Sequence, residues 1–287
     1  MQVGLHALGI GSGADRAVID AVASAADRHG FTTLWAGEHV VMVDRSESRY
    51  PYSADGVIAV PAQADWLDPW VTLSFAAAAS SRIRLATGVL LLPEHNPVIV
   101  AKQAASLDKL SGGRLTLGVG VGWSREEFDA LGIPFARRAA RTTEYVAALR
   151  ALWRNDIASF SGEFVGFDSI RVNPKPPGDI PVVVGGNSDA ALRRVAAWGD
   201  GWYGFNVDGL AAVRERVGKL EQFCADSGRE RSELRLAVAL VSPEVEDIGA
   251  LEELGIDELV LVAAPPNSAD AVPDWVSALA EKWELAL

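Results

Sequence analysis

The stretch of sequence that decides the fold is residues 82–123, RIRLATGVLLLPEHNPVIVAKQAASLDKLSGGRLTLGVGVGW. It predicts a strand at 83–88, a helix from Asn96-Pro97 to about residue 110, a Gly-Gly turn and a second strand at 114–118. Asn and Pro are favoured at the cap and in the first turn of a helix. Gly, Pro, His and Asn dominate the loops that follow the two strands. A parallel α/β enzyme holds a flat cofactor in loops of this kind, at the carboxyl ends of its strands.

The same alternation of strand and helix extends outward over nearly the whole chain. Further strands are predicted at 3–8, 32–36, 181–184, 201–203, 235–240 and 258–262. Eight strands, each followed by a helix, predict one TIM (β/α)8 barrel domain over residues 1–287. The exceptions are a hairpin-like excursion at 157–178 and a long insertion at 40–67, which we expect to form a lid.

Composition excludes several classes of function. The net charge is −12 with no cluster of Lys and Arg, which disfavours nucleic acid as a partner. No apolar run approaches the ~20 residues of a membrane span. The only cysteine is Cys224, which excludes an internal disulfide and any CxxC site. The N-terminus has no basic region of a signal peptide, so we expect a cytoplasmic protein that acts on a small molecule.

Candidate catalytic groups follow the first strands. Glu38-His39 comes directly after the second strand and His6 lies in the first. Histidine titrates near neutral pH and suits proton exchange, so His39 with Glu38 forms the candidate catalytic pair. His6, with Tyr50 and Trp66 of the insertion, is a candidate for substrate contact. The aromatic side chains of the insertion favour an apolar or planar substrate.

Two glycine-rich loops are candidates for holding a cofactor. Gly120, Val121 and Gly122 follow the fourth strand, where small residues let a ligand approach the backbone. Gly185, Gly186 and Asn187 follow the fifth strand and open a helix, with Asn187 as its expected cap. Free N–H groups and the helix dipole make such a turn suited to phosphate.

A series of motifs resembles the luciferase-like monooxygenase superfamily, in the family's order over about residues 1–205. They are LWAGEH, YPYSADG, LDPW, TGVLLLPEHNPVIVAKQAASLDKLSGGR, GVGWSREEF, PKPP and VVVGGNSDAALRRVAAWGDGW. The likeness is greatest to the branch that uses the deazaflavin coenzyme F420.

The resemblance implies an F420-dependent oxidoreductase that transfers a hydride between the deazaflavin C5 and a small organic substrate. It implies that His39 and Glu38 lie close to the ring, and that a non-proline cis peptide at Gly88-Val89 forms a bulge behind it, next to Leu90. It also implies a phosphate site at Gly185–Asn187 and a homodimer. Trp123 departs from the catalytic Glu of some F420-dependent sugar-phosphate dehydrogenases, which argues against a sugar phosphate.

Four alternatives remain open at this point. An FMN-dependent luciferase-like monooxygenase would use the same scaffold, and a barrel can also bind a cofactor without turnover. Gly9-x-Gly11-x-Gly13-Ala14, with Glu38 further along, partly fits a nicotinamide-binding fingerprint. A metal-dependent hydrolase could use His6, His39, His95 and Glu38, although the spacing of these residues predicts no metal site.

Overall fold

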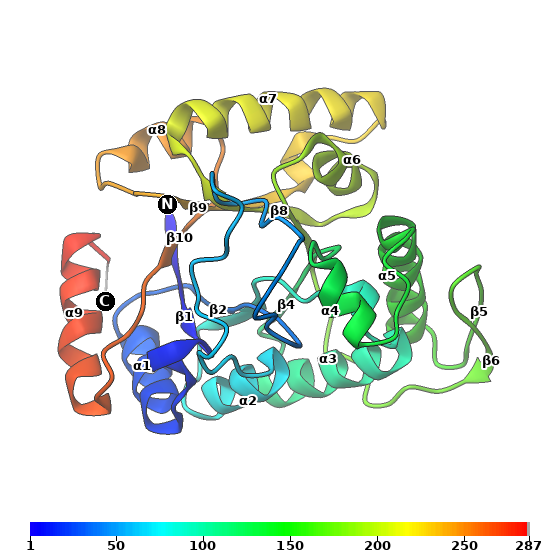
Figure 1. The fold of residues 1–287 in the computed structure, drawn as a ribbon, viewed down its shortest axis with the longest axis horizontal. Helices are drawn as coiled ribbons and strands as arrows, with labels where there is room; N and C mark the ends of the chain where they lie inside the picture. The colour runs from blue at the N-terminus through cyan, green and yellow to red at the C-terminus, as the bar shows by residue number, and fades with distance from the viewer. Residues whose placement is uncertain (286–287) are drawn as a thin grey trace.

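Eight parallel strands close into a barrel in the computed structural model of the chain, which describes residues 1–285 (Figure 1). Their order around the barrel is β1-β10-β9-β8-β7-β4-β3-β2. The barrel strands are β1 (Gln2–Leu8), β2 (Thr33–Ala36), β3 (Arg84–Thr87), β4 (Leu115–Val119), β7 (Val182–Gly185), β8 (Gly201–Val207), β9 (Arg235–Leu240) and β10 (Glu258–Val262). The predicted TIM barrel is therefore confirmed.

Helices surround the barrel and connect its strands. They are α1 (Arg16–Arg28), α2 (Pro69–Ala78), α3 (Pro97–Ser111), α4 (Arg125–Ala130), α5 (Arg138–Arg154), α6 (Asp189–Trp198), α7 (Gly209–Asp226), α8 (Asp247–Glu253) and α9 (Val272–Lys282). Four short 3-10 turns are η1 (Gly11–Ala14), η2 (Leu92–Glu94), η3 (Arg231–Glu233) and η4 (Ala269–Ala271). No helix within residues 1–285 is long and apolar enough to cross a membrane.

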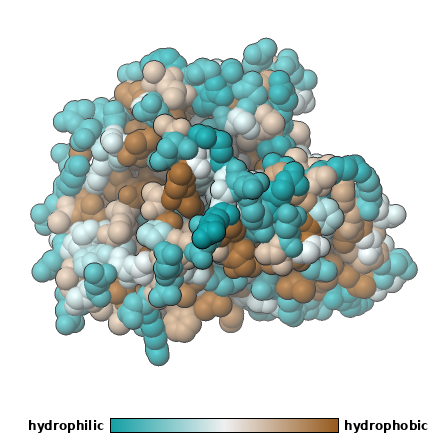
Figure 2. All heavy atoms as spheres, viewed as in Figure 1, coloured by the Kyte–Doolittle hydropathy of each residue, from teal (hydrophilic) through white to brown (hydrophobic). Residues whose placement is uncertain are grey.

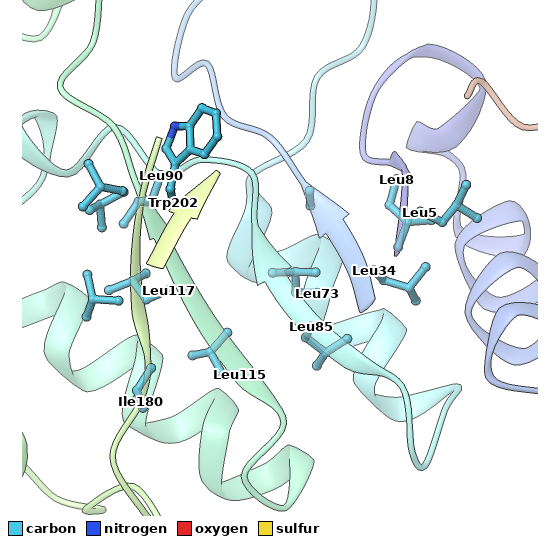
Figure 3. Packing of buried hydrophobic residues seen from close by; sticks show 14 of the residues in the cluster. Leu5, Leu8, Leu34, Leu73, Leu85, Leu90, Leu115, Leu117, Ile180 and Trp202 are labelled. Atoms are coloured by element: carbon cyan, nitrogen blue, oxygen red, sulfur yellow. The ribbon is translucent and has the colours of Figure 1, made fainter. Parts of the chain in front are cut away.

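Two apolar cores hold the barrel and its helices together. The outer core lies between the strands and the helices, where Leu34, Leu85 and Leu117 are fully buried (Figure 3). The inner core fills the barrel itself, where Trp35 stacks on Tyr203 with ring centroids 4.4 Å apart and Ala86 and Ala237 leave room for them. Because the interior is packed, a ligand site must lie at an end of the barrel.

Side-chain caps begin several of the helices. The Asn96 side chain accepts from the Val98 N–H at 2.9 Å, directly before Pro97, and the Asp68 side chain accepts from Val71. The prediction was wrong by one residue at Asn187. Ser188 caps α6 instead, with its hydroxyl accepting from the Ala191 N–H at 3.2 Å.

The two excursions lie outside the barrel, as predicted. The antiparallel hairpin of β5 (Ala158–Ser161) and β6 (Gly166–Ile170) stands beside α5. Segment 40–67 crosses the front of the barrel in Figure 1. Its far end is held against the loop after β1, where Leu67 donates to the Gly9 carbonyl at 2.8 Å and Gly11 donates to Asp65 at 2.9 Å. Figure 2 shows apolar residues reaching the surface near the middle of this face.

Candidate active site

A bulge at the carboxyl end of β3 forms the floor of the site. The peptide bond Gly88-Val89 is cis, as predicted. The Val89 side chain occupies a socket of glycines: a Cβ atom on Gly120 or Gly185 would lie 2.7 or 2.8 Å from a Val89 methyl group. These glycines are therefore required by Val89, whatever a ligand needs. The Val89 side chain is thus turned toward the neighbouring strands β4 and β7.

Hydrogen bonds to β4 fix the bulge in place. Leu90 donates to the Gly118 carbonyl at 2.9 Å and accepts from the Gly120 N–H at 2.8 Å. The Leu90 side chain is fully buried in the outer core, so it faces away from the barrel end (Figure 3). The predicted place of Leu90 in the cofactor site would therefore rest on its backbone, and it stays a prediction.

Glu38 anchors the bulge from the side of β2. Its Oε2 accepts from the Leu91 N–H at 2.6 Å, and its Oε1 bonds with His95 Nε2 at 2.9 Å. Both oxygens are occupied and the side chain is buried. The contacts make Glu38 a residue that positions the bulge, and its catalytic role stays a prediction.

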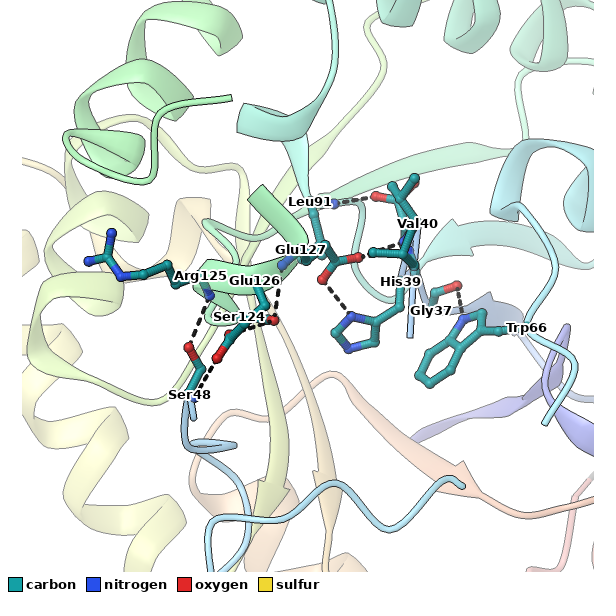
Figure 4. A network of polar contacts seen from close by, with 12 residues as sticks. Gly37, His39, Val40, Ser48, Trp66, Leu91, Ser124, Arg125, Glu126 and Glu127 are labelled. Carbon is teal, nitrogen blue, oxygen red and sulfur yellow. Dashed lines mark hydrogen bonds and ion pairs between the residues drawn. The ribbon is translucent and has the colours of Figure 1, made fainter. Parts of the chain in front are cut away.

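His39 is held by a residue that the sequence did not single out for this role. Its Nδ1 lies 2.8 Å from Glu127 Oε2, while Glu127 Oε1 accepts from the Val40 N–H at 2.7 Å (Figure 4). A carboxylate only accepts, so Nδ1 of His39 carries a proton and Nε2 is the nitrogen available to a ligand. Trp66 and Trp123 flank the imidazole edge-on at 4.9 and 5.7 Å between ring centroids.

In the sequence, Glu127 is the fourth position of a Ser-x-x-Glu pattern at the start of α4, which predicts a capping box with Ser124. Half of this capping box forms, because Ser124 Oγ accepts from the Glu127 N–H at 3.3 Å. The Glu127 carboxylate does not return to Ser124 and bonds with His39 and Val40 instead. The neighbouring Glu126 accepts from the Glu47 and Ser48 N–H groups at 2.7 and 3.0 Å, so α4 also holds the insertion.

His6 lies deeper in the barrel, below the bulge. Its Nδ1 is 3.1 Å from the Tyr203 hydroxyl, and a Cβ atom on Gly88 would lie 3.2 Å from its Cε1. Burial lowers the pKa of His6 to about 4 and raises the pKa of Tyr203 well above its ordinary value. His6 is therefore neutral near pH 7 and can offer a hydrogen bond but not a charge.

The insertion brings aromatic rings to the same end of the barrel. Tyr50 packs edge-on against Trp123 at 5.3 Å and against Tyr52 at 5.4 Å. Tyr52 in turn contacts Phe205 at the end of β8, at 5.5 Å. Tyr50 and Trp66 thus lie near the barrel end, and their contact with a substrate stays a prediction; Phe205 is an aromatic residue of the same group that the sequence did not indicate.

The loop after β4 requires a glycine at position 122, because its neighbours leave no room for a side chain. A Cβ atom on Gly122, whose φ is +73°, would lie 2.6 Å from the Phe128 ring and 3.0 Å from Glu94 Oε1. Val121 beside it is half-buried. Arg138 of α5 donates to the Gly122 carbonyl at 3.0 Å.

Polar groups without partners gather at the turn after β7. Gly186 has a φ of +115° and donates to the Tyr203 carbonyl at 3.3 Å. Its N–H is therefore engaged, whereas the sequence predicted a free N–H group at this position. Asn187 donates to Phe205 at 2.7 Å, but its buried Oδ1 has no hydrogen-bond partner within residues 1–285. Over the same residues, the Nε of Arg194 is also unpaired. Burial, and then the charge of Arg138, lower the pKa of Arg194.

Comparisons with known proteins identify the family of the chain. The sequence model of the luciferase-like monooxygenase family matches residues 4–247. The chain belongs to the luciferase-like monooxygenase family. Rv0953c of Mycobacterium tuberculosis is 38% identical over 272 residues, which cover 93% of this chain and 95% of that protein.

Solved structures share the fold of this family. Monooxygenase RslO1 from Streptomyces bottropensis aligns with a TM-score of 0.76 and 18% identity over 98% of both chains. An F420-dependent secondary alcohol dehydrogenase, in complex with an F420-acetone adduct, aligns with a TM-score of 0.75 and 16% identity over 98% of both chains. The FMN-bound oxygenating component of 3,6-diketocamphane monooxygenase from Pseudomonas putida aligns with a TM-score of 0.62 and 18% identity, over 83% of this chain and 67% of that one. Oxidoreductase chemistry on a luciferase-like barrel is therefore the class of reaction that the family supports.

Two alternatives do not fit a luciferase-like barrel with these contacts. The glycines after β1 form no dinucleotide turn, because the N–H groups of Gly9, Gly11 and Gly13 all donate to backbone carbonyls. Within the described residues 1–285, no group of three or more His, Cys, Asp or Glu side chains could hold a metal ion. His95, a ligand in the hydrolase interpretation, is bonded to Glu38.

Proposed function

We propose that the chain is an F420-dependent oxidoreductase that transfers a hydride between C5 of the deazaflavin and a carbon of a small organic substrate. The observation that carries this proposal is the pair His39–Glu127 at the barrel end. The Glu127 carboxylate fixes the imidazole at 2.8 Å, and no hydrogen bond occupies His39 Nε2 within residues 1–285. A positioned imidazole of this kind is what a proton-coupled redox reaction at carbon needs.

The residues around the barrel end fit a bound cofactor. The carbonyl oxygen of the Asn187 side chain and the Arg194 Nε are buried polar atoms that a ligand would satisfy. Arg194 of α6, the helix that follows the turn Gly185–Asn187, and the nearby Arg138 supply positive charge that would hold the anionic part of the cofactor. F420, when bound, supplies a carrier for one hydride, that is, for two electrons and a proton.

His39 manages the proton that accompanies the hydride. Reduction of a carbonyl carbon requires a proton at oxygen, and oxidation of an alcohol releases one. His39 Nε2 would donate or accept this proton, while Glu127 stabilises the imidazolium form at Nδ1. Trp66 and Trp123 pack on the ring and limit the access of water.

The walls of the site favour an apolar or planar substrate. Tyr50, Tyr52, Trp123 and Phe205 form a chain of edge-on aromatic contacts over the barrel end. Trp123 cannot exchange a proton, which agrees with a substrate other than a sugar phosphate.

FMN is the second candidate cofactor, and it would make the protein a monooxygenase. The FMN-bound diketocamphane monooxygenase component shares the fold, and the unpaired Arg194 Nε could donate to the FMN phosphate. A cofactor-binding barrel without turnover is the remaining alternative.

Binding of oxidised F420 and of FMN to the purified protein, measured by fluorescence under matched conditions, tests the proposal. F420 should bind more tightly than FMN, and Asn187→Ala should weaken its binding by about tenfold, a loss of about 1.4 kcal/mol for one hydrogen bond from a ligand N–H or O–H to the Asn187 Oδ1. Asn155→Ala is the matched control, because Asn155 lies exposed at the end of α5. Tighter binding of FMN would instead favour the monooxygenase, and binding of neither would exclude both cofactors. Turnover of acceptor substrates with reduced F420 then separates an enzyme from a non-catalytic barrel.

We also propose that two copies of the chain associate. Helices α2 and α3 pack side by side, and each presents large apolar side chains to solvent, including Phe75 and Ile99. Exposed apolar patches of this kind mark interfaces. Light scattering after size-exclusion chromatography should give twice the mass of 30.5 kDa, and Ile99→Asp should return it to the single mass.

A further inference from the structure

A third buried carboxyl group lies beside the site and has no role in the mechanism so far. Glu94 ends η2, directly after the bulge, and only 6% of its surface is exposed. Both of its carboxyl oxygens are buried, and neither has a hydrogen-bond partner within residues 1–285. Buried carboxyl groups are nearly always hydrogen-bonded, so this one requires an explanation.

The neighbours of Glu94 are the two carboxylates of the site. Glu127 and Glu38 both act on it electrostatically, and its Oε1 lies 3.0 Å from where a Cβ atom on Gly122 would be. The oxygens of Glu127 are occupied by His39 and Val40, and those of Glu38 by Leu91 and His95. No imidazole is therefore left for Glu94.

The nearby arginines do not compensate Glu94 either. Arg141 donates to the carbonyls of Pro93 at 3.3 Å and Ala136 at 3.0 Å, and Arg138 donates to that of Gly122 at 3.0 Å. Both guanidinium groups are thus engaged with backbone around Glu94 and form no bond with its carboxyl group.

An ionised Glu94 would be a buried charge without a donor, close to two charges of the same sign. Such a group takes up a proton instead of remaining charged. Burial, and then the charges of Glu127 and Glu38, raise the pKa of Glu94 to about 9.

We propose that Glu94 is a positioning residue that stays in its neutral form and thereby sets the charge around the Glu127–His39 pair. While Glu94 keeps its proton, it adds no negative charge beside the Glu127–His39 pair. When Glu94 ionises, the added negative charge favours the imidazolium form of His39. The catalytic consequence rests on the proposed function, but the protonation of the cluster does not.

Histidine NMR on the cofactor-free protein tests this inference. The chain has only four histidines, and the His39 signals are assigned by their loss in His39→Gln. In the wild type, the His39 chemical shift should show a step in the alkaline range, near pH 9, where Glu94 ionises. In Glu94→Gln, whose amide is a neutral isostere of the protonated acid, this step should be absent. A wild-type His39 signal without an alkaline step would overturn the proposal, as would a step that persists in Glu94→Gln.

Asp108→Asn is the matched control. Asp108 is also buried, and burial raises its pKa, but it bonds with the Leu115 N–H at the opposite end of β4. This variant should keep the alkaline step of His39. If Glu94→Gln does not fold, the wild-type titration still decides, together with the infrared C=O stretch of a neutral carboxyl group, which should disappear as the pH rises through about 9. Because no cofactor is present, a negative result here leaves the proposed function untouched.

Discussion

His39 and Glu127 are joined by a hydrogen bond of 2.8 Å between Nδ1 and Oε2, although 88 positions separate them in the chain. The other oxygen of Glu127 accepts from Val40, the first residue of the insertion. One carboxylate thus fixes the tautomer of the candidate catalytic imidazole and the point where the insertion leaves the barrel. Movement of the insertion at Val40 would therefore shift the Glu127 carboxylate and, with it, the His39 imidazole.

Replacement of His39 by Gln should remove proton transfer while leaving the fold intact. A well-placed general acid or base contributes about 10²- to 10⁴-fold to a rate, so kcat should fall by that factor. Cofactor binding should change little, because the Asn187 and Arg194 groups remain. Steady-state kinetics with reduced F420 and a carbonyl substrate measure the loss. A variant with wild-type kcat would show that the proton comes from elsewhere.

Replacement of Glu127 by Gln should lower kcat through His39. The amide no longer stabilises an imidazolium, so we expect a loss of about 10- to 10³-fold and a shift of the pH profile. In the double variant His39→Gln/Glu127→Gln, the losses should not add, because both residues act in one unit. Asp129→Asn, an exposed position on the same helix, is the control and should leave kcat unchanged. Additive losses would contradict the coupling.

Local patterns predict the fold well because they act over a few residues. Asn96-Pro97 begins α3 as predicted, and the apolar runs become buried strands. The same reasoning failed where two patterns overlap. Asn187 and Ser188 are both good caps, and the position of β7 selects Ser188 and leaves Asn187 to bond with Phe205.

The site was harder to predict because its contacts are not local. Glu127 fits a capping pattern, and only closure of the barrel brings it to His39. Tyr52 and Phe205 meet across 153 positions, as the sequence numbering shows, and no motif links them. Gly120 and Gly185 were expected to serve a ligand, whereas the space that these two glycines leave is filled by Val89.

The glycine socket makes Gly185→Ala a sensitive test of the bulge. The new methyl group would lie 2.8 Å from one Val89 methyl carbon and 3.2 Å from the other. Overpacking of this kind costs about 1–3 kcal/mol, so the free energy of unfolding in urea should fall by that amount. Gly178→Ala is the control, since nothing lies within 4 Å of a Cβ atom there.

The substitution Val89→Ala should relieve the clash with the new methyl group at position 185, because it removes the two Val89 methyl groups. In the double variant Gly185→Ala/Val89→Ala, the loss of stability should be smaller than the sum of the two single losses. Simple additivity would mean that Val89 does not occupy the socket.

The buried His6 should make the protein less stable in acid. Burial lowers its pKa from 6.5 to about 4 in the folded state, so the unfolded chain binds the extra proton. Neutral His6 therefore contributes its full stabilisation of the folded state above pH 6.5, and this contribution is lost as the pH falls toward about 4. At 1.36 kcal/mol per pKa unit, the loss is on the order of 3 kcal/mol. Urea unfolding between pH 7.5 and 4.5 should show it in the wild type and not in His6→Gln. His29→Gln, at the end of α1, is the control and should keep the wild-type slope. An equal slope in wild type and His6→Gln would show that other groups cause the acid sensitivity.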